Sequence, residues 1–193
     1  VTNAGRTASG KTGDDGSVAG LIDDGIILPP DLPLPGVSIP IYFSANSGTT
    51  WSIREPVLSV SQFTAFRWTS VAMSEDGNNL AVTGIEYNLL QPSLGWSGHV
   101  YTSTNAGSVW QGALLYSFPW NWVAMSGNGS DLLIAGGIVG TSTNQGASWY
   151  NSYLPPGAWT AVGISTDGTR MVASEYPYSP YPGRLGTSLD SGT

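Results

Sequence analysis

The eight residues Ser142-Thr143-Asn144-Gln145-Gly146-Ala147-Ser148-Trp149 recur, with small changes, at three other places in the 193-residue chain. The related segments are residues 44–51, 103–110 and 188–193, and the last of these lacks the tryptophan. All four keep a serine, an Asn or Asp two residues later, and a glycine two residues after that. This recurrence predicts a fold assembled from repeated units.

A second pattern precedes three of these segments. It begins with a tryptophan at Trp68, Trp120 and Trp159 and reaches a turn at Asp76-Gly77, Asn128-Gly129 and Asp167-Gly168. The centres of the eight-residue segments lie 59, 39 and 46 residues apart, close to the roughly 40 to 50 residues of one propeller blade. One blade per repeat is therefore expected.

Each repeat predicts a small antiparallel sheet. In the best-defined unit, residues 68–74, 80–84, 99–103 and 109–115 are expected as strands, with Asp76-Gly77 as a tight turn. In the eight-residue segments, the Asn or Asp side chain is expected to accept hydrogen bonds from backbone N–H groups, and the glycine is expected to have a positive φ. The tryptophan is expected to cover the hydrophobic layer. The residues assigned to this structural role are Asn46, Gly48, Trp51, Asn105, Gly107, Trp110, Asn144, Gly146, Trp149, Asp190 and Gly192.

These segments resemble the Ser-x-Asp-x-Gly-x-x-Trp repeat of the Asp-box (bacterial neuraminidase repeat, sialidase-like) superfamily. The resemblance implies an all-β fold, a β-propeller or propeller fragment of about four four-stranded antiparallel blades. Residues 39–193 are expected to hold the repeats, and residues 1–38 an N-terminal arm or a partial first blade. Three of the four segments have Asn in place of Asp, which keeps the acceptor but removes the charge. The last unit lacks its fourth strand, which another segment or another chain is expected to supply.

Composition excludes several function classes. The net charge is −7 and Lys11 is the only lysine, so no basic surface is available for nucleic acid. There is no cysteine, and His99 is the only histidine, so zinc sites and histidine-based triads lack their residues. No cofactor or metal is expected. No apolar run approaches the roughly 20 residues of a membrane-spanning helix.

The long connections between units gather aromatic residues. Residues 85–98, 116–119, 150–158 and 175–183 are expected as loops at the end of the blades opposite the repeated segments. Aromatic rings on stiff loops stack well on sugar rings or apolar peptide surfaces, although they can also simply pack the loops onto the rim. The candidate ligand-binding residues are Tyr87, Trp96, Tyr116, Phe118, Tyr153, Tyr176, Tyr178 and Tyr181. Glu86 and Glu175 suggest a glycosidase pair, but a structural role is favoured for both.

The expected function is a non-enzymatic extracellular module that binds protein or glycan, or that takes part in self-assembly. Two alternatives stay open. The first is a fragment of a sialidase-like glycoside hydrolase, but Ile53-Arg54-Glu55-Pro56 follows the first repeated segment in the wrong order for that family's motif, so no catalytic residue is assigned. The second is a lumenal propeller similar to photosystem II assembly factors, located in the thylakoid lumen, but those carry a basic patch that six basic residues do not provide.

Overall fold

The computed structural model describes residues 40–56, 64–91, 93, 95–114, 118–177 and 182–192. Within these ranges the chain forms strands and turns and no helix. The strands are β1 (Tyr42–Phe43), β2 (Ser52–Ile53), β3 (Thr64–Met73), β4 (Leu80–Asn88), β5 (Trp96–Ser103), β6 (Gln111–Leu114), β7 (Trp120–Met125), β8 (Leu132–Gly136), β9 (Val139–Ser142), β10 (Tyr150–Asn151), β11 (Trp159–Ile164), β12 (Met171–Glu175) and β13 (Leu185–Ser188).

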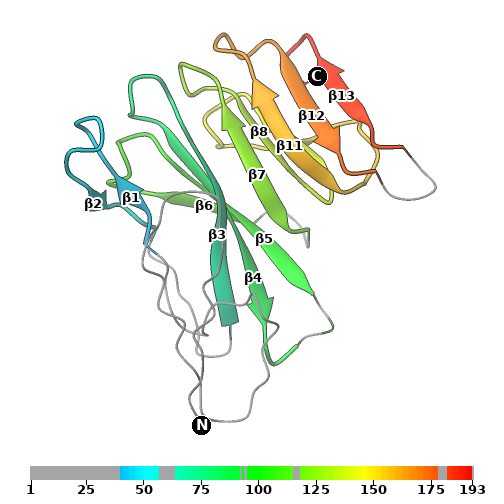
Figure 1. Ribbon diagram of the computed structural model, residues 1–193, viewed down its shortest axis with the longest axis horizontal. Coiled ribbons are helices and arrows are strands. Elements are labelled where there is room, and N and C mark those ends of the chain that lie inside the picture. The colour runs from blue at the N-terminus through cyan, green and yellow to red at the C-terminus, as the bar shows by residue number, and fades with distance from the viewer. Residues whose placement is uncertain are drawn as a thin grey trace.

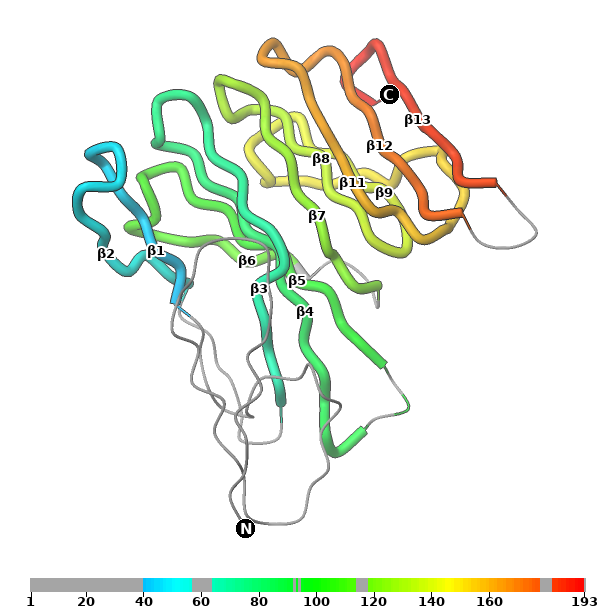
Figure 2. Tube along the Cα trace, viewed as in Figure 1, coloured from blue at the N-terminus to red at the C-terminus, as the bar shows by residue number. Residues whose placement is uncertain are grey.

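The strands form four antiparallel sheets in chain order. The first holds β1 and β2, the second β3 to β6, the third β7 to β10, and the fourth β11 to β13. The sheets stand side by side like blades, with the first at one side of the molecule and the fourth at the other (Figures 1 and 2). We refer to them as blades one to four. The chain is thus all-β and has the architecture of a β-propeller segment.

Blade three has a hydrophobic face on each side. Leu132 and Ile134 of β8 belong to a core cluster with Ala81 and Val100 of blade two. Leu133 and Ala135 belong to the cluster on the other side, together with Trp159, Met171 and Ala173 of blade four and Val139 of blade three itself. Because alternate side chains of a strand point to opposite faces, the unbroken apolar run 132–135 fits a strand that is buried on both sides.

The first strands of blades two, three and four each contain a bulge one residue after their tryptophan. The register shifts between Trp68 and Ser70, between Trp120 and Trp122, and between Trp159 and Ala161. In blade two the bulged residue, Thr69, donates its hydroxyl hydrogen bond to the carbonyl oxygen of Trp120 in blade three at 2.7 Å. The bulge therefore turns a side chain out of the ladder and toward the next blade.

The four repeated segments form one type of hairpin bend, which we call the corner turn. In blade two, Ser103 Oγ accepts the N–H of Gly107 at 2.9 Å and donates to Asn105 Oδ1 at 3.0 Å. Asn105 Oδ1 also accepts the N–H of Val109 at 2.8 Å. Ala106 and Gly107 have φ values of 54° and 77°, a left-handed pair that favours glycine at the second position. The serine hydroxyl therefore organises the bend together with the Asn side chain.

The other three corner turns repeat this geometry. The serine-to-glycine hydrogen bonds measure 2.9 Å from Gly48, 2.9 Å from Gly146 and 2.8 Å from Gly192. The corner turns also contact the first hairpin turns, since the backbone N–H of Ala106 donates to Asn78 O at 2.8 Å and that of Gln145 donates to Ser130 O at 2.8 Å. In blades two and three the corner turn thus lies beside the first hairpin turn of the same blade.

Three expectations from the sequence need correction. The segment 85–98 is not one long loop, because β4 continues to Asn88 and β5 begins at Trp96. The fourth strand of blade two is Gln111–Leu114, shorter than the expected 109–115. Trp51 does not cover a hydrophobic layer, because 61% of its surface is exposed. The proposed strands within residues 1–38 lie outside the described residues.

Candidate functional site

The long strands of blade two carry an aromatic cluster near the end opposite the corner turns. Tyr87 on β4 pairs with Trp96 on β5, and their ring centroids are 5.1 Å apart. The guanidinium carbon of Arg67 on β3 lies 5.4 Å from the centre of the Trp96 ring. All three residues are partly exposed. We call this group the Arg67 cluster.

Among the described residues no carboxylate forms an ion pair with Arg67, and packing against the indole holds it in the cluster. Its Nε atom is buried and has no hydrogen-bond partner among the described residues. A cation above an indole ring is attracted by about 0.5–2 kcal/mol, depending on how far water is excluded. The cluster therefore combines a positively charged group with two aromatic rings on a strand framework, which suits a partner with a planar or acidic group.

The opposite face of the same sheet holds a second group, which the sequence analysis did not identify. Glu86 Oε2 lies 2.8 Å from His99 Nε2, without the alignment of a hydrogen bond. The His99 ring stacks with that of Tyr101, with centroids 6.3 Å apart and an interplanar angle of 9°. Burial, and then the charge of Glu86, raise the pKa of the Tyr101 hydroxyl. His99 and Glu86 are diagonal neighbours, because Gly84 faces His99 and Glu86 faces Ser97.

The signal for this pair was present in the sequence but weak. A single histidine suggests no metal site or triad, and His99 was set aside for that reason. Diagonal neighbours on adjacent strands are close enough for long side chains to meet, but they are found only when the register is known. The register in turn depends on where β4 ends, which the turn residues did not reveal.

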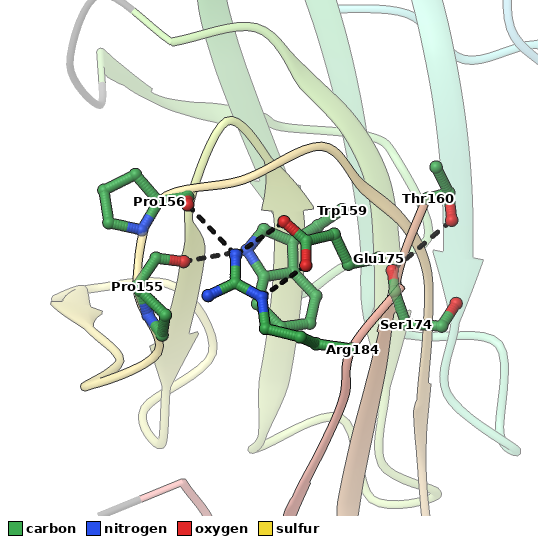
Figure 3. A network of polar contacts seen from close by, with 7 residues as sticks. All are labelled: Pro155, Pro156, Trp159, Thr160, Ser174, Glu175 and Arg184. Atoms are coloured by element: carbon green, nitrogen blue, oxygen red, sulfur yellow. Dashed lines mark hydrogen bonds and ion pairs between the residues drawn. The ribbon is translucent and has the colours of Figure 1, made fainter. Parts of the chain in front are cut away.

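A polar network joins the loop after blade three to the end of blade four (Figure 3). Arg184 binds both carboxylate oxygens of Glu175, with Nη2 2.5 Å from Oε1 and Nε donating to Oε2. Arg184 Nη2 also donates to the carbonyl oxygen of Pro156 at 3.2 Å, and the guanidinium carbon lies 5.6 Å from the Trp159 ring centre. The Trp159 indole N–H donates to Pro155 O at 3.3 Å. This network fastens the loop to the sheet.

The hydrogen bonds from Arg184 lower the pKa of the Glu175 carboxyl, and those to Glu175 raise the pKa of the Arg184 guanidinium. Glu175 is thereby kept ionised. The approach of the loop is close, because a Cβ atom on Gly157 would lie 1.9 Å from Glu175 Oε1. Both observations give Glu175 a structural role, as the sequence analysis favoured.

The five predicted ligand-binding residues that the structure describes are spread over several elements. Tyr87 and Trp96 are the only two of the eight whose rings pair among the described residues. Phe118, just before β7, is 39% exposed and lies against Gly137, which is between β8 and β9. Tyr153 and Tyr176 are 98% and 64% exposed, with no ring partner in the described part of the chain. Tyr116, Tyr178 and Tyr181 lie outside the described residues.

The described ranges hold neither a metal-binding group nor a membrane-spanning helix. No three His, Asp or Glu side chains there are grouped so that they could hold a metal ion. No helix long and apolar enough to cross a bilayer is present there either.

Comparison with solved structures finds similarity over much of the chain. YCF48 bound to D1 peptide is 18% identical with a TM-score of 0.46, over 72% of this chain and 44% of that one. The GH74 enzyme of Niastella koreensis is 14% identical with a TM-score of 0.32, over 83% and 38%. The Cps50 (Swd1) β-propeller domain of Myceliophteria thermophila is 11% identical with a TM-score of 0.33, over 64% and 58%.

The chain spans less than half of the length of the first two of these structures. With sequence identities of 18% or less and TM-scores below 0.5, these similarities support no conclusion about function. The sequence matches no protein-family model, and the comparison with curated proteins finds no match.

Proposed function

We propose that this chain is a non-enzymatic binding module of the Asp-box type, which contacts a protein or a glycan outside the cell through aromatic side chains. The observation that carries the proposal is the Arg67 cluster. Tyr87 and Trp96 are fixed by strand pairing, and Arg67 lies against the indole. Rings held on strands lose little conformational entropy when a partner binds.

The chemistry of the cluster supports recognition rather than turnover. An arginine over an indole offers a flat cationic surface, suited to a carboxylate, a ring face or a sugar with acidic substituents. A chain with a net charge of −7 presents few other attractive groups to such a partner. This makes Arg67 the natural point of electrostatic contact.

The carboxylates do not favour the sialidase-like alternative. Glu175 is bound at both oxygens by Arg184, and a carboxyl whose pKa is lowered is a poor general acid at neutral pH. Glu86 contacts His99 and lies on the sheet face opposite the Arg67 cluster. Turnover of a fluorogenic sialoside by the purified chain would reverse this assignment.

The test compares the wild-type chain with Trp96→Ala in two parallel assays, a glycan array and a pull-down from an extracellular protein fraction. A ligand found in either assay is expected to bind Trp96→Ala about tenfold more weakly, as for an aromatic anchor at an interface centre. Tyr42→Ala is the matched control, because Tyr42 is an exposed aromatic residue (53%) on β1, outside this cluster. Equal binding by wild type and Trp96→Ala would contradict the proposal.

A further inference from the structure

Blade two projects beyond blades three and four at the end opposite the corner turns (Figure 1). Its second strand, β4, has nine residues, whereas the equivalent strands β8 and β12 have five each. All three strands begin directly after the first hairpin turn of their blade, so β4 reaches about 13 Å further. In blade three only Gly137 and Ile138 connect β8 to β9, so the fold itself does not require the extension. We call residues 85–98 the projecting hairpin.

The tip of the projecting hairpin is an ordered turn with an apolar side chain in solvent. Asn88 Oδ1 accepts the N–H of Leu90 at 2.9 Å, and Asn88 O accepts that of Gln91 at 3.2 Å. Leu90 is 66% exposed. Residues 87–98 contain three leucines, a tyrosine and a tryptophan, and no charged residue or histidine. An exposed apolar tip of this kind marks a contact surface.

The side chains of the projecting hairpin change in character with distance from the tip. Leu90 lies at the tip, and Tyr87 pairs with Trp96 at the next level. Arg67 on β3 faces Ile85, which is about 7 Å further from the tip than Tyr87. A membrane surface has the same order, from acyl chains, through the interface that Trp and Tyr prefer, to the charged head groups.

The charged residues are arranged so that this end of the molecule can approach a membrane. The acidic residues in and beside the turns lie at the other end of the blades, and they are Glu75, Asp76, Asp131, Asp167 and Asp190. Glu86, the only acidic residue of the projecting hairpin, contacts His99. Because no described carboxylate pairs with Arg67, its guanidinium is available to an anionic group at the membrane surface.

The tip and the Arg67 cluster supply two different contacts. A short apolar segment alone gives weak, reversible membrane binding, and stable attachment takes a second contact. The Arg67 cluster lies at the level of the head groups when Leu90 is among the acyl chains. Its two rings suit a sugar face, and its guanidinium suits an acidic substituent on that sugar.

We propose that the projecting hairpin inserts its tip into a membrane whose lipids carry acidic sugar head groups, and that the Arg67 cluster binds these sugars. The inference rests on the proposed function, because it takes the glycan partner of the cluster to be the head group of a glycolipid. It adds Leu90 as a contact residue outside the cluster.

Vesicle binding of the 193-residue chain tests the proposal. Phosphatidylcholine vesicles carry 3-sulfogalactosylceramide, galactosylceramide, which lacks only the sulfate, or no glycolipid, and the bound chain is measured by co-sedimentation. The chain is expected to bind the sulfated vesicles at least about tenfold more tightly than the other two. Leu90→Asp is expected to weaken this binding about tenfold. Val109→Asp makes the same charge change at a residue that is 63% exposed near the opposite end of blade two, and it is expected to bind like wild type.

A single label reports insertion directly, because the chain has no cysteine. Leu90→Cys carries an environment-sensitive fluorophore, and Val109→Cys with the same label is the control. On the sulfated vesicles, emission from position 90 is expected to shift to shorter wavelength and to be protected from quenching by iodide. Emission from position 109 is expected to stay unchanged.

A soluble polymer that carries the same sulfated galactose separates this inference from the proposed function. Leu90→Asp is expected to bind the polymer like wild type, whereas Trp96→Ala is expected to bind polymer and vesicles at least about tenfold more weakly. Equal binding of the polymer by wild type and Trp96→Ala would contradict the proposed function itself.

Several results would overturn the membrane inference and leave the proposed function standing. They are binding of the polymer without binding of the sulfated vesicles, equal vesicle binding by wild type and Leu90→Asp, equal binding to vesicles without glycolipid, or an unshifted label at position 90. Capture of a protein that depends on Trp96, without any vesicle binding, would assign the Arg67 cluster to a protein partner and equally overturn the inference.

Discussion

The backbone N–H of Gly127 in blade three donates to the carbonyl oxygen of Thr166 in blade four, with an N···O distance of 2.9 Å. The same bond joins Glu75 of blade two to Gly127 O, also at 2.9 Å. Glu75, Gly127 and Thr166 occupy the same position in the first hairpin turns of their blades. A line of backbone hydrogen bonds therefore connects successive blades at the edge that carries the corner turns, and it fixes the step from one blade to the next.

Removing one donor from this line tests its contribution. Gly127→Pro eliminates the N–H that bonds to Thr166, so the free energy of unfolding is expected to fall by about 1–3 kcal/mol. Gly127→Ala is the control for steric effects, because a Cβ at this position would lie 2.6 Å from Thr166 Cγ2. The proline variant is expected to lose at least about 1 kcal/mol more than the alanine variant. Urea unfolding followed by tryptophan fluorescence measures both. Equal stability of the two variants would show that the inter-blade bond contributes little.

The serine of the corner turn is expected to matter as much as the Asn. Ser142 is fully buried, and its hydroxyl accepts a hydrogen bond from the N–H of Gly146 and donates one to Asn144 Oδ1. Ser142→Ala leaves that N–H without its acceptor and should lower the free energy of unfolding by about 1–2 kcal/mol. Exposed Thr143 supplies the control, and Thr143→Ala should change it by under about 0.5 kcal/mol.

Asn144→Asp examines the departure from the Asp-box pattern. Asn144 Oδ1 accepts the N–H of Ser148 at 2.9 Å, and Asn144 Nδ2 donates to Ser148 Oγ at 2.8 Å. Aspartate keeps the acceptor, and the serine hydroxyl can turn to donate to it. The free energy of unfolding at pH 7 is therefore expected to stay within about 0.5 kcal/mol of wild type in the same urea titration. A loss above 1 kcal/mol would show that the amide donor is required.

The parts of this fold that depend on local sequence could be predicted. A corner turn places its serine, Asn and glycine within five residues, so its pattern is visible without the structure. The diagonal contact between Glu86 and His99 depends on register over two strands. The inter-blade hydrogen bond of Gly127 depends on the relative orientation of neighbouring sheets. It is formed by backbone atoms, which are present whatever the sequence, so no residue pattern marks it. Tyr87 and Trp96 were expected in a loop but lie in strands. The expectation was wrong because no turn signal in the sequence marks the end of β4.

The tryptophans that follow the corner turns are not equivalent. Trp149 is partly buried against the core between blades two and three, whereas Trp51 is 61% exposed and donates its indole N–H to Gly48 O at 3.1 Å. Trp149→Ala should lower the free energy of unfolding by about 2 kcal/mol, below the roughly 3–5 kcal/mol of a fully buried ring. Trp51→Ala should lower it by under about 1 kcal/mol. Equal losses would mean that burial does not distinguish the two sites.

The ion pair between Glu175 and Arg184 predicts a specific response to acid. The bonds from Arg184 hold the folded-state pKa of Glu175 below its usual value, which is about 4.3 in an unfolded chain. The carboxylate therefore contributes stability above that value, and the contribution is lost as the pH falls through the lower folded-state pKa. Glu175→Gln removes this contribution, so its thermal midpoint should lie below that of wild type at pH 7. The difference should narrow at pH 3, as measured by differential scanning calorimetry. A difference that stays constant between pH 7 and pH 3 would show that the amide disturbs packing around Gly157 and Trp159 and that the charge of Glu175 has no part in stability.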